Sequence, residues 1–580
     1  MAPARSGPVA GIREEAGQLA FLTRHFFGRL FRNEVVDFED QMKERLIAVL
    51  AVLAIIVFWS SEMLLFKYHF VPDTNVSWQE KTYILTLVMI IFGIVTLLEW
   101  DVLFPDRQDY LNLMPLPVRL RTVFFGKLAS FILFIGLFSV AMNSGASVLF
   151  TVYLAQWRAQ GDLVFAAWYA ASHLIAAFAA CSFVFFACVF LQFLLMAVLP
   201  YRFYRRIALL VRGGLLAGFI FLLLAFLFEP ALLDSSFRSM AGLKEAGGAL
   251  FFRFPPFWFV GLYETLIGTP DPMFAPLAKS AVTALLLSLA GFAAASGLSY
   301  FRHVRKTLEV VPRKPWFPGL RDGWERLFGR AALREPEERA VYGFFARTLR
   351  SSQKHRITMV YYLAIAAAVI MLYIIISRQG FRDLTPSNAA LLAQPLVLAL
   401  ILLAGLRSVV NIPASPKANW VFEVTDTGRT MVYVRGMKKS ILFRWLVPMS
   451  VLVLASHLLI WNAGPAFRHA VFVLAVSGLA LEAYFARFRK VPFACTYVPG
   501  KFRFHVWGIP LAIFFLGFLA LTSRLEKALL GSTANFLVFL AAAGAAWLGV
   551  HFRNRRFYRE ASLLFEDQPE PAMVTFPDRP

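Results

Sequence analysis

Twelve apolar runs of helical length divide this chain, and they determine the solvent in which it must fold. The hydrocarbon core of a bilayer is about 30 Å thick, so a helix needs roughly 20 apolar residues to cross it. Helices suit such a core because they pair their own backbone N–H and C=O groups where no water is present. The runs lie near residues 46–66, 82–98, 124–154, 164–200, 207–228, 275–301, 357–377, 388–411, 441–462, 467–486, 506–523 and 532–552. We therefore predict an all-α polytopic membrane protein with about 12 transmembrane helices.

Composition and charge argue against a soluble protein and against a nucleic-acid-binding protein. The hydrophobic fraction is 59% and the mean hydropathy is +0.62, whereas a soluble domain is about 45–50% apolar. The formal net charge is +22, and about 46 of the 58 Lys and Arg residues lie in or beside segments that share one face if the runs cross in turn. If the basic segment 302–356 is left out, 32 of these Lys and Arg residues remain on that face, against 12 on the opposite face and at the ends of the runs. The positive-inside rule then predicts that both termini are cytoplasmic.

Motifs for catalysis, metal binding and nucleotide binding are absent from the sequence. The three cysteines form no C-x-x-C pair, and no G-x-x-x-x-G-K-[ST] or H-E-x-x-H motif occurs. We therefore predict no catalytic residue, no metal site and no cofactor bound by the chain itself. His173, His457 and Glu482 lie within or near apolar runs, where an ionisable group is a functional candidate by default. For the single histidines, however, we expect hydrogen bonds between helices.

A short motif occurs twice and indicates an internal repeat. FFGRLFR at 26–32 precedes the first run and FFARTLR at 344–350 precedes the seventh, both with the pattern F-F-x-R-x-x-R. The motif residues are Phe26, Phe27, Arg29, Arg32, Phe344, Phe345, Arg347 and Arg350. Apolar residues recur at helical spacing around the first copy, which predicts a helix lying along the membrane interface with its apolar side in lipid. The alternative is an amphipathic helix packed against another cytoplasmic segment.

Two further pairs of segments follow the same order in each half of the chain. One pair, residues 97–128 and 411–443, follows the second run of each half. Each member contains a Pro-containing stretch and ends in a basic cluster. A third pair, after the fourth run of each half, begins at residues 199 and 498. Because six is an even number, duplicated six-span halves have the same orientation in the membrane. We expect a cytoplasmic N-terminal segment at residues 1–45 and a first half at 46–301. A basic linker with the second interfacial helix follows at 302–356, then a second half at 357–552 and a cytoplasmic tail at 553–580.

A segment between the fifth and sixth runs is too short to cross the membrane. RFPPFWFVGLYETLIG, residues 253–268, is interrupted by two prolines and rich in aromatic residues. Such a segment is typical of a re-entrant or interface-lying hairpin on the outer side. An ordinary outer loop with a buried aromatic turn is the alternative.

The segment FPDRQDYLNLMPLPVRLRTVFFGKL, residues 104–128, resembles the cytoplasmic loop of the membrane subunit of a type-2 ABC exporter. The resemblance implies an exporter permease in the bacterial cytoplasmic membrane, surrounded by lipid, with an unknown cargo. It also implies separate ABC ATPase subunits, in two copies, which use ATP and Mg²⁺ and dock on coupling elements after the second and eighth spans. The coupling residues implied are Arg107, Asp109, Tyr110, Pro115, Pro117, Arg119 and Arg121 in the first half, and Asn419, Trp420, Phe422, Arg429 and Arg435 in the second.

Two other classes of protein fit the same pattern of runs. Twelve spans in two parallel halves also describe an ion-coupled secondary transporter of the major-facilitator plan. An integral membrane lipid or glycan transferase is the other alternative, and it requires acids or histidines converging from distant spans. The second half has no equivalent of the M-P-L-P sequence at residues 114–117. The two docking surfaces are therefore expected to be unequal.

Overall fold

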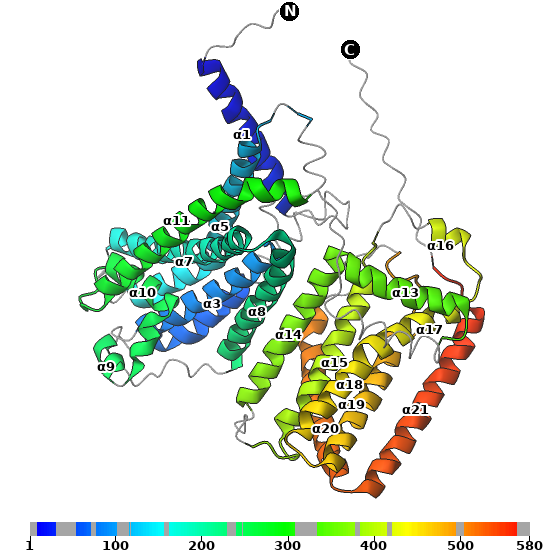
Figure 1. Cartoon of the computed structure of the whole chain (residues 1–580). Helices are drawn as coiled ribbons and strands as arrows, with labels where there is room; N and C mark the ends of the chain where they lie inside the picture. Colours follow the sequence, from blue (N-terminus) through cyan, green and yellow to red (C-terminus); the bar gives the residue numbers. More distant parts are fainter. Residues whose placement is uncertain are drawn as a thin grey trace, which may run out of the picture. The chain divides into compact units, whose positions relative to one another are not determined.

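The computed structural model describes residues 8–30, 54–70, 77–100, 115–116, 118–155, 162–228, 239–245, 247–307, 333–376, 383–414, 420–494 and 504–564. The chain forms two compact units, Met1–Val311 and Pro312–Pro580 (Figure 1). The division falls inside the segment 302–356 that the sequence predicts as a linker. Each unit is a bundle of helices, and no strand occurs in the ranges just given.

Unit 1 contains the helices predicted from the second to the sixth apolar run. Residues 54–65, within the first run, are also helical. The elements are α1 (Pro8–Leu30), η1 (Phe66–His69), α3 (Trp78–Leu98), α5 (Leu120–Phe150), η2 (Thr151–Ala155), α7 (Leu163–Val198), α8 (Tyr201–Phe228), α9 (Met240–Glu245), η4 (Gly248–Arg253), α10 (Pro255–Leu266) and α11 (Phe274–Thr307). Helix α7 packs against α3, α5, α8 and α11, so it is central to the unit.

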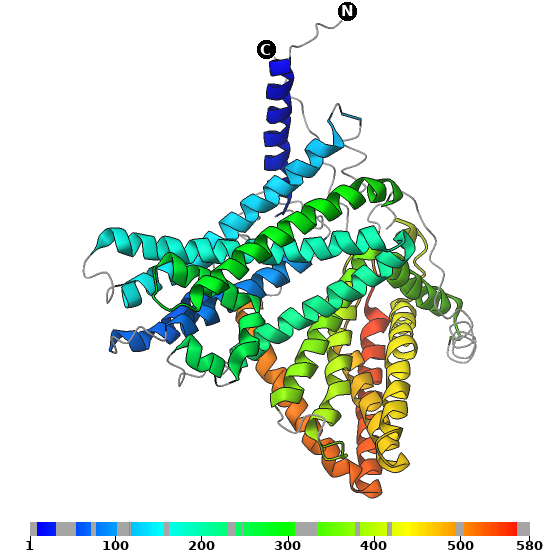
Figure 2. The ribbon, with the colours of Figure 1, turned by 60° about the vertical axis from the view of Figure 1, so that its left-hand side comes forward.

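Unit 2 contains the helices predicted from the last six runs. The elements are α13 (Pro336–Ser351), α14 (Gln353–Ile376), α15 (Ala389–Val410), α16 (Trp420–Val424), α17 (Thr430–Ile441), η6 (Leu442–Leu446), α18 (Val447–Leu458), α19 (Ala463–Tyr484), α20 (Phe504–Leu530) and α21 (Thr533–Glu560). The long helices run side by side, while α13 lies across one end of this bundle (Figures 1 and 2).

Ten helices among the described residues are long and apolar enough to cross a membrane, which supports a multi-pass helical membrane protein. These segments are Trp78–Leu98, Arg121–Ala155, Leu163–Val198, Arg206–Phe226, Phe274–Ser299, Gln353–Ile375, Ala389–Val410, Thr430–Leu458, Ala463–Tyr484 and Thr533–Glu560. The other two predicted runs are 46–66, which the structure describes from residue 54, and 506–523, which lies within the 27-residue helix α20.

The ninth span begins earlier than the sequence predicts. The apolar run starts near residue 441, but α17 begins at Thr430 and continues through η6 into α18. Hydropathy misses α17 because this helix is amphipathic: it buries Val434 and Met437 while Lys438 and Lys439 occupy the same turns. Arg435 therefore lies in a helix rather than in a loop.

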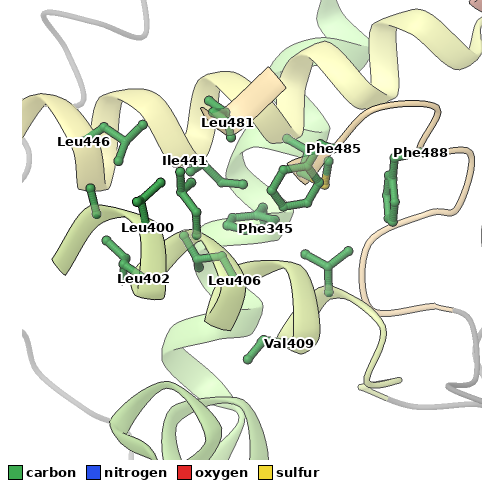
Figure 3. Packing of buried hydrophobic residues seen from close by; sticks show 14 of the residues in the cluster. Phe345, Leu400, Leu402, Leu406, Val409, Ile441, Leu446, Leu481, Phe485 and Phe488 are labelled. Atoms are coloured by element: carbon green, nitrogen blue, oxygen red, sulfur yellow. The ribbon is translucent and has the colours of Figure 1, made fainter. Parts of the chain in front are cut away.

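The two predicted interfacial helices exist, but protein rather than lipid covers their apolar sides. In α1, Leu22 and Phe26 are buried against Val123 of α5. In α13, Phe345 is completely buried in the core of unit 2, against α15 and α17 (Figure 3). The expectation that these stripes lie in lipid is wrong for Phe26 and Phe345, because neighbouring helices offer a better-packed apolar surface. Both side chains pack against other helices of the chain, whereas the alternative names another cytoplasmic segment and stays a prediction.

Other members of the two motifs are more accessible or lie outside the described side chains. Phe27 and Phe344 are half-buried, Arg347 is exposed and Arg350 is half-buried. The side chain of Arg29 and the whole of Arg32 lie outside the described part of the chain. The arginines described are thus on the accessible side of α13, opposite its buried stripe.

Glycine allows the closest helix contacts in both units. A Cβ on Gly436 of α17 would lie 2.7 Å from the carbonyl oxygen of Glu338 in α13. A Cβ on Gly261 of α10 would lie 2.3 Å from the Cβ of Leu277 in α11. Small residues at such positions let helix backbones approach closely, as is typical of membrane proteins.

The short helix α10 corresponds to the segment that the sequence predicts as re-entrant. It has 12 residues, a length of about 18 Å at 1.5 Å per residue, which is too short to cross a bilayer. It packs against α3, α7 and α11, and Phe259, Val260 and Tyr263 are fully buried. It is therefore a short helix packed within the bundle of unit 1.

We expect Phe345→Ala to lower the free energy of unfolding by about 3–5 kcal/mol, because it leaves a cavity in a core made by several helices. The measurement is an SDS titration of the purified protein. Arg347→Ala on the exposed side of the same helix is the matched control and should change stability by less than about 0.5 kcal/mol. Equal stability of the two variants would mean that the stripe of α13 faces lipid after all.

Candidate functional sites

The candidate coupling element of unit 1 is described only where it joins α5. Arg107, Asp109, Tyr110 and Pro117 lie outside the described residues, whereas Pro115, Arg119 and Arg121 are described and exposed.

Arg119 is the residue immediately before α5 and has extended backbone geometry. Its Nη1 donates to Oε1 of Glu15 in α1 at 2.5 Å, with 78% and 52% of the two side chains exposed. An exposed pair of this kind contributes at most about 1 kcal/mol. Arg121 has no ion pair recorded within the described ranges.

The candidate coupling element of unit 2 is held against α13 by ion pairs. Asn419 lies outside the described residues, and Trp420 begins α16 although its side chain is not described. Arg429 forms ion pairs with Glu335 and with Glu337 at 3.5 Å, and Arg435 lies 3.6 Å from Glu335.

Apolar contacts complete this arrangement. The ring of Phe422 lies 5.2 Å from that of Phe344, centroid to centroid. Val424, at the end of α16, is 76% exposed. Arg429 and Arg435 thus pair with Glu335, the residue before α13, and Phe422 packs on Phe344 within α13. The resemblance implies these same side chains as partner contacts. Val424 adds an exposed apolar side chain at the end of α16.

A buried ion pair that the sequence analysis did not single out ties α3 to α10. Lys81 Nζ lies 2.7 Å from Glu264 Oε1, and both side chains are at most 2% exposed. Thr269 donates to Glu264 Oε2 at 2.5 Å. The ammonium of Lys81 also lies 4.5 Å from the ring centroid of Tyr263 and 5.0 Å from that of Tyr169. We call these five residues the lysine cluster.

His173 lies beside the lysine cluster and differs from its expected role. Its ring is tilted against that of Phe150 at 5.1 Å and meets that of Tyr263 edge to face at 5.4 Å, centroid to centroid. Neither of its ring nitrogens has a hydrogen-bond partner among the described residues. The predicted hydrogen bond to another helix is therefore wrong for His173, which is a buried ring in an aromatic group.

A second set of buried ionisable side chains links α18, α19 and α20. It consists of His457, His469 and Glu526 with the ring of Trp461, and we call it the histidine cluster. His469 Nδ1 lies 2.5 Å from Glu526 Oε1, and both side chains are fully buried. The rings of His457 and Trp461 lie 4.6 Å and 5.4 Å from that of His469. His457 Nδ1 contacts the carbonyl oxygen of Val453 in its own helix at 2.8 Å, so it makes no hydrogen bond to another helix through that atom.

Glu482 has a structural role in unit 2. Its Oε2 accepts from Lys438 Nζ at 2.6 Å and from Asn554 Nδ2 at 2.9 Å. These bonds join α19 to α17 and α21. Because both partners come from other helices, Glu482 is a tie between three helices at the end of the bundle where α13 lies.

Among the described residues, no group of three or more His, Cys, Asp or Glu side chains could hold a metal ion. Comparison with models of protein families finds no matching family. Searches of curated proteins and of solved structures find no match either. The function is therefore argued from the helices and the sites above.

We expect Lys81→Met to lower the free energy of unfolding by about 3–5 kcal/mol, because Glu264 is then buried without its counter-charge. The double variant Lys81→Met/Glu264→Leu should recover most of that loss, since a buried ion pair is replaced by apolar groups. Lys67→Met is the control, because Lys67 is half-exposed in its pair with Glu80. SDS titration measures all three, and a Lys81 variant no less stable than the control would contradict the prediction.

Proposed function

We propose that this chain is the permease of an ABC exporter, built from two parallel six-helix halves, and that it forms the translocation path. Separate ABC ATPase subunits, in two copies, dock on its cytoplasmic loops and supply ATP hydrolysis with Mg²⁺. The chain itself performs no bond chemistry. The proposed location is the bacterial cytoplasmic membrane, with both termini in the cytoplasm and a cargo that stays unidentified.

The observation that carries the proposal is a packing pattern that recurs in the same order in both units. In unit 1, α3 contacts α7 and α8, and α7 contacts α5, α8 and α11. In unit 2, α15 contacts α19 and α20, and α19 contacts α18, α20 and α21. The helix before the first span packs on the start of the third in each case, as α1 on α5 and α13 on α17. This correspondence supports a duplicated six-helix plan.

The α1–α5 and α13–α17 contacts also support the docking role of the adjoining loops. A loop can transmit force only if it is joined to rigid elements. In unit 1 the Arg119–Glu15 pair joins the loop before α5 to α1. In unit 2 the pairs of Arg429 and Arg435 with Glu335 join the segment after α16 to α13. ATPase subunits docked at these loops would act on two helices at once in each half.

We expect charge reversal at Arg119 or Arg121 to reduce the ATPase retained on co-purification from native membranes roughly tenfold or more, because like charges at an interface cost several kcal/mol. The swapped pair Glu15→Arg/Arg119→Glu separates docking from internal structure. It restores the ion pair to α1 but keeps a negative charge at position 119, so retention should stay low.

Membrane insertion is measured in the same samples, since changes in positive residues can alter topology. Full retention in the swapped variant would show that Arg119 acts through α1 and not by touching the ATPase. An intact parent complex that never retains an ATPase subunit would contradict the whole proposal.

The two buried ionisable groups favour a second candidate, an ion-coupled secondary transporter. Such transporters use buried acids and histidines in membrane segments as proton relays. Lys81–Glu264 and His469–Glu526 are both buried inside bundles of apolar helices. This class would need no ATPase partner.

The second candidate predicts that the purified chain in liposomes, with an imposed pH gradient and no nucleotide, accumulates a solute from a whole-cell metabolite extract. Mass spectrometry of the liposome contents is the readout. Glu526→Gln should abolish accumulation and Asp383→Asn, in an exposed loop, should leave it unchanged. Accumulation that appears only with ATP and a co-purified ATPase would instead support the exporter.

A further inference from the structure

A basic pocket lies where α21 ends. Its cavity volume is about 370 Å³, within the range of about 300–1,000 Å³ typical of ligand sites. The lining residues are Arg489, Arg553, Arg556, Phe557, Glu560 and Ala561. We call this cavity the arginine pocket.

Helix geometry explains why these side chains share one cavity. Arg553, Arg556 and Glu560 follow the i, i+3, i+7 spacing that places residues on one face of a helix. Arg489 approaches from the segment after α19, and its guanidinium carbon lies 5.9 Å from the ring centroid of Phe557. Leu564 N donates to Arg489 O at 2.8 Å, which fixes this segment beside the end of α21.

The turn that delivers Arg489 has an unusual backbone. Arg487 has a φ of 52°, in the left-handed region that residues with a side chain rarely adopt. Its guanidinium carbon also lies 5.9 Å from the Phe557 ring centroid. Such a conformation costs of order 1–3 kcal/mol and persists where the surrounding structure holds it. Here it turns the segment that carries Arg487 and Arg489 toward the end of α21, where Arg553 and Arg556 lie.

Among the described residues, no ion pair balances the positive charge of the pocket. Three guanidinium groups and one carboxylate line it, and none of these arginines has an ion pair recorded in the described residues. Elsewhere in unit 2, Arg429 and Arg435 do pair with Glu335. A cavity with three converging guanidinium groups is suited to phosphate oxygens, which arginine binds through parallel N–H donors.

The position of the pocket along α21 indicates which phosphate it meets. Residues 533–552 of α21 are apolar and span about 30 Å, the thickness of the hydrocarbon core. Arg553 and Arg556 therefore emerge at the level of lipid headgroups. Leu548, Phe552 and Arg556 are four residues apart, and the two apolar side chains are 48% and 62% exposed. An acyl chain can lie along this stripe while its phosphate reaches the pocket.

The end of the bundle at which the pocket lies also carries the basic loops. Thr430, the first residue of α17, donates to the carbonyl oxygen of Ala561 at 2.7 Å. This bond places the pocket beside the segment from α16 to α17. By the positive-inside rule this is the cytoplasmic side, where anionic headgroups attract basic residues.

We propose that the arginine pocket binds the phosphate of an anionic phospholipid. Arg489, Arg553 and Arg556 donate to the phosphate oxygens, and Glu560 accepts a hydrogen bond from a headgroup hydroxyl. The acyl chains follow Leu548 and Phe552. This site requires only that the chain spans a membrane, so it stands whether ATP or an ion gradient drives transport.

The test is binding of phosphatidylglycerol to the purified full-length protein in detergent, followed by native mass spectrometry. Phosphatidylcholine with the same acyl chains is the lipid control. Arg553→Gln/Arg556→Gln should weaken phosphatidylglycerol binding about 25-fold, since each basic residue near an anionic lipid contributes about fivefold. Arg555→Gln/Arg559→Gln removes the same charge from the same helix end without touching the pocket, and should weaken binding by less than about twofold.

Three outcomes would overturn the proposal. Equal losses in the two double variants would mean diffuse attraction to a basic helix end. Equal binding of the two lipids would mean that the headgroup charge is not recognised. Full displacement of the lipid by millimolar inorganic phosphate would identify a site for a free anion. An unchanged unfolding midpoint in the SDS titration confirms that each variant is folded.

Discussion

Pairing of backbone N–H and C=O groups within helices is the constraint on which the rest of this structure depends, because hydrocarbon offers them no other partner. Once the backbone is paired, helices in lipid gain little from hydrophobic association and are held by close packing and polar contacts. Both kinds of contact are present. Gly436 and Gly261 allow backbones to approach, while the Lys81–Glu264 ion pair and the buried contact of His469 with Glu526 join helices.

Charge is used differently at the two levels of the bundles. Inside them, Lys81 pairs with Glu264 and His469 contacts Glu526, and an unpaired buried charge would be costly. At the helix ends of unit 2, Glu482 ties three helices and Glu335 holds two arginines. The arginine pocket departs from this rule, since its three guanidinium groups have no such partner in the described chain. An end of a membrane protein that balances most of its charges but leaves one cavity positive is equipped to hold an anion supplied by its surroundings.

The apolar runs predicted helices well where hydrophobicity alone defines a segment, as for α3, α7 and α15, whose bounds lie within a few residues of the runs. They failed at α17, because an amphipathic helix packed on protein does not differ in composition from a polar loop. The same ambiguity affected α1 and α13. A stripe of Leu and Phe suits both lipid and protein, and only the neighbouring helices distinguish the two. Of the predicted coupling residues, Arg429 and Arg435 have partners far away in the sequence, which no local pattern reveals.

The sequence by itself determined the solvent, the helical class and the positions of most helices, because length and hydropathy act locally along the chain. It also determined the uneven distribution of positive charge. The tertiary structure decided which charges meet. Lys81 and Glu264 are 183 residues apart, and His469 and Glu526 are 57 apart, so their pairing depends on which helices are neighbours. It likewise decided that Arg489 shares a cavity with Arg553 and Arg556, since a turn after one helix and the end of another must come together to form it.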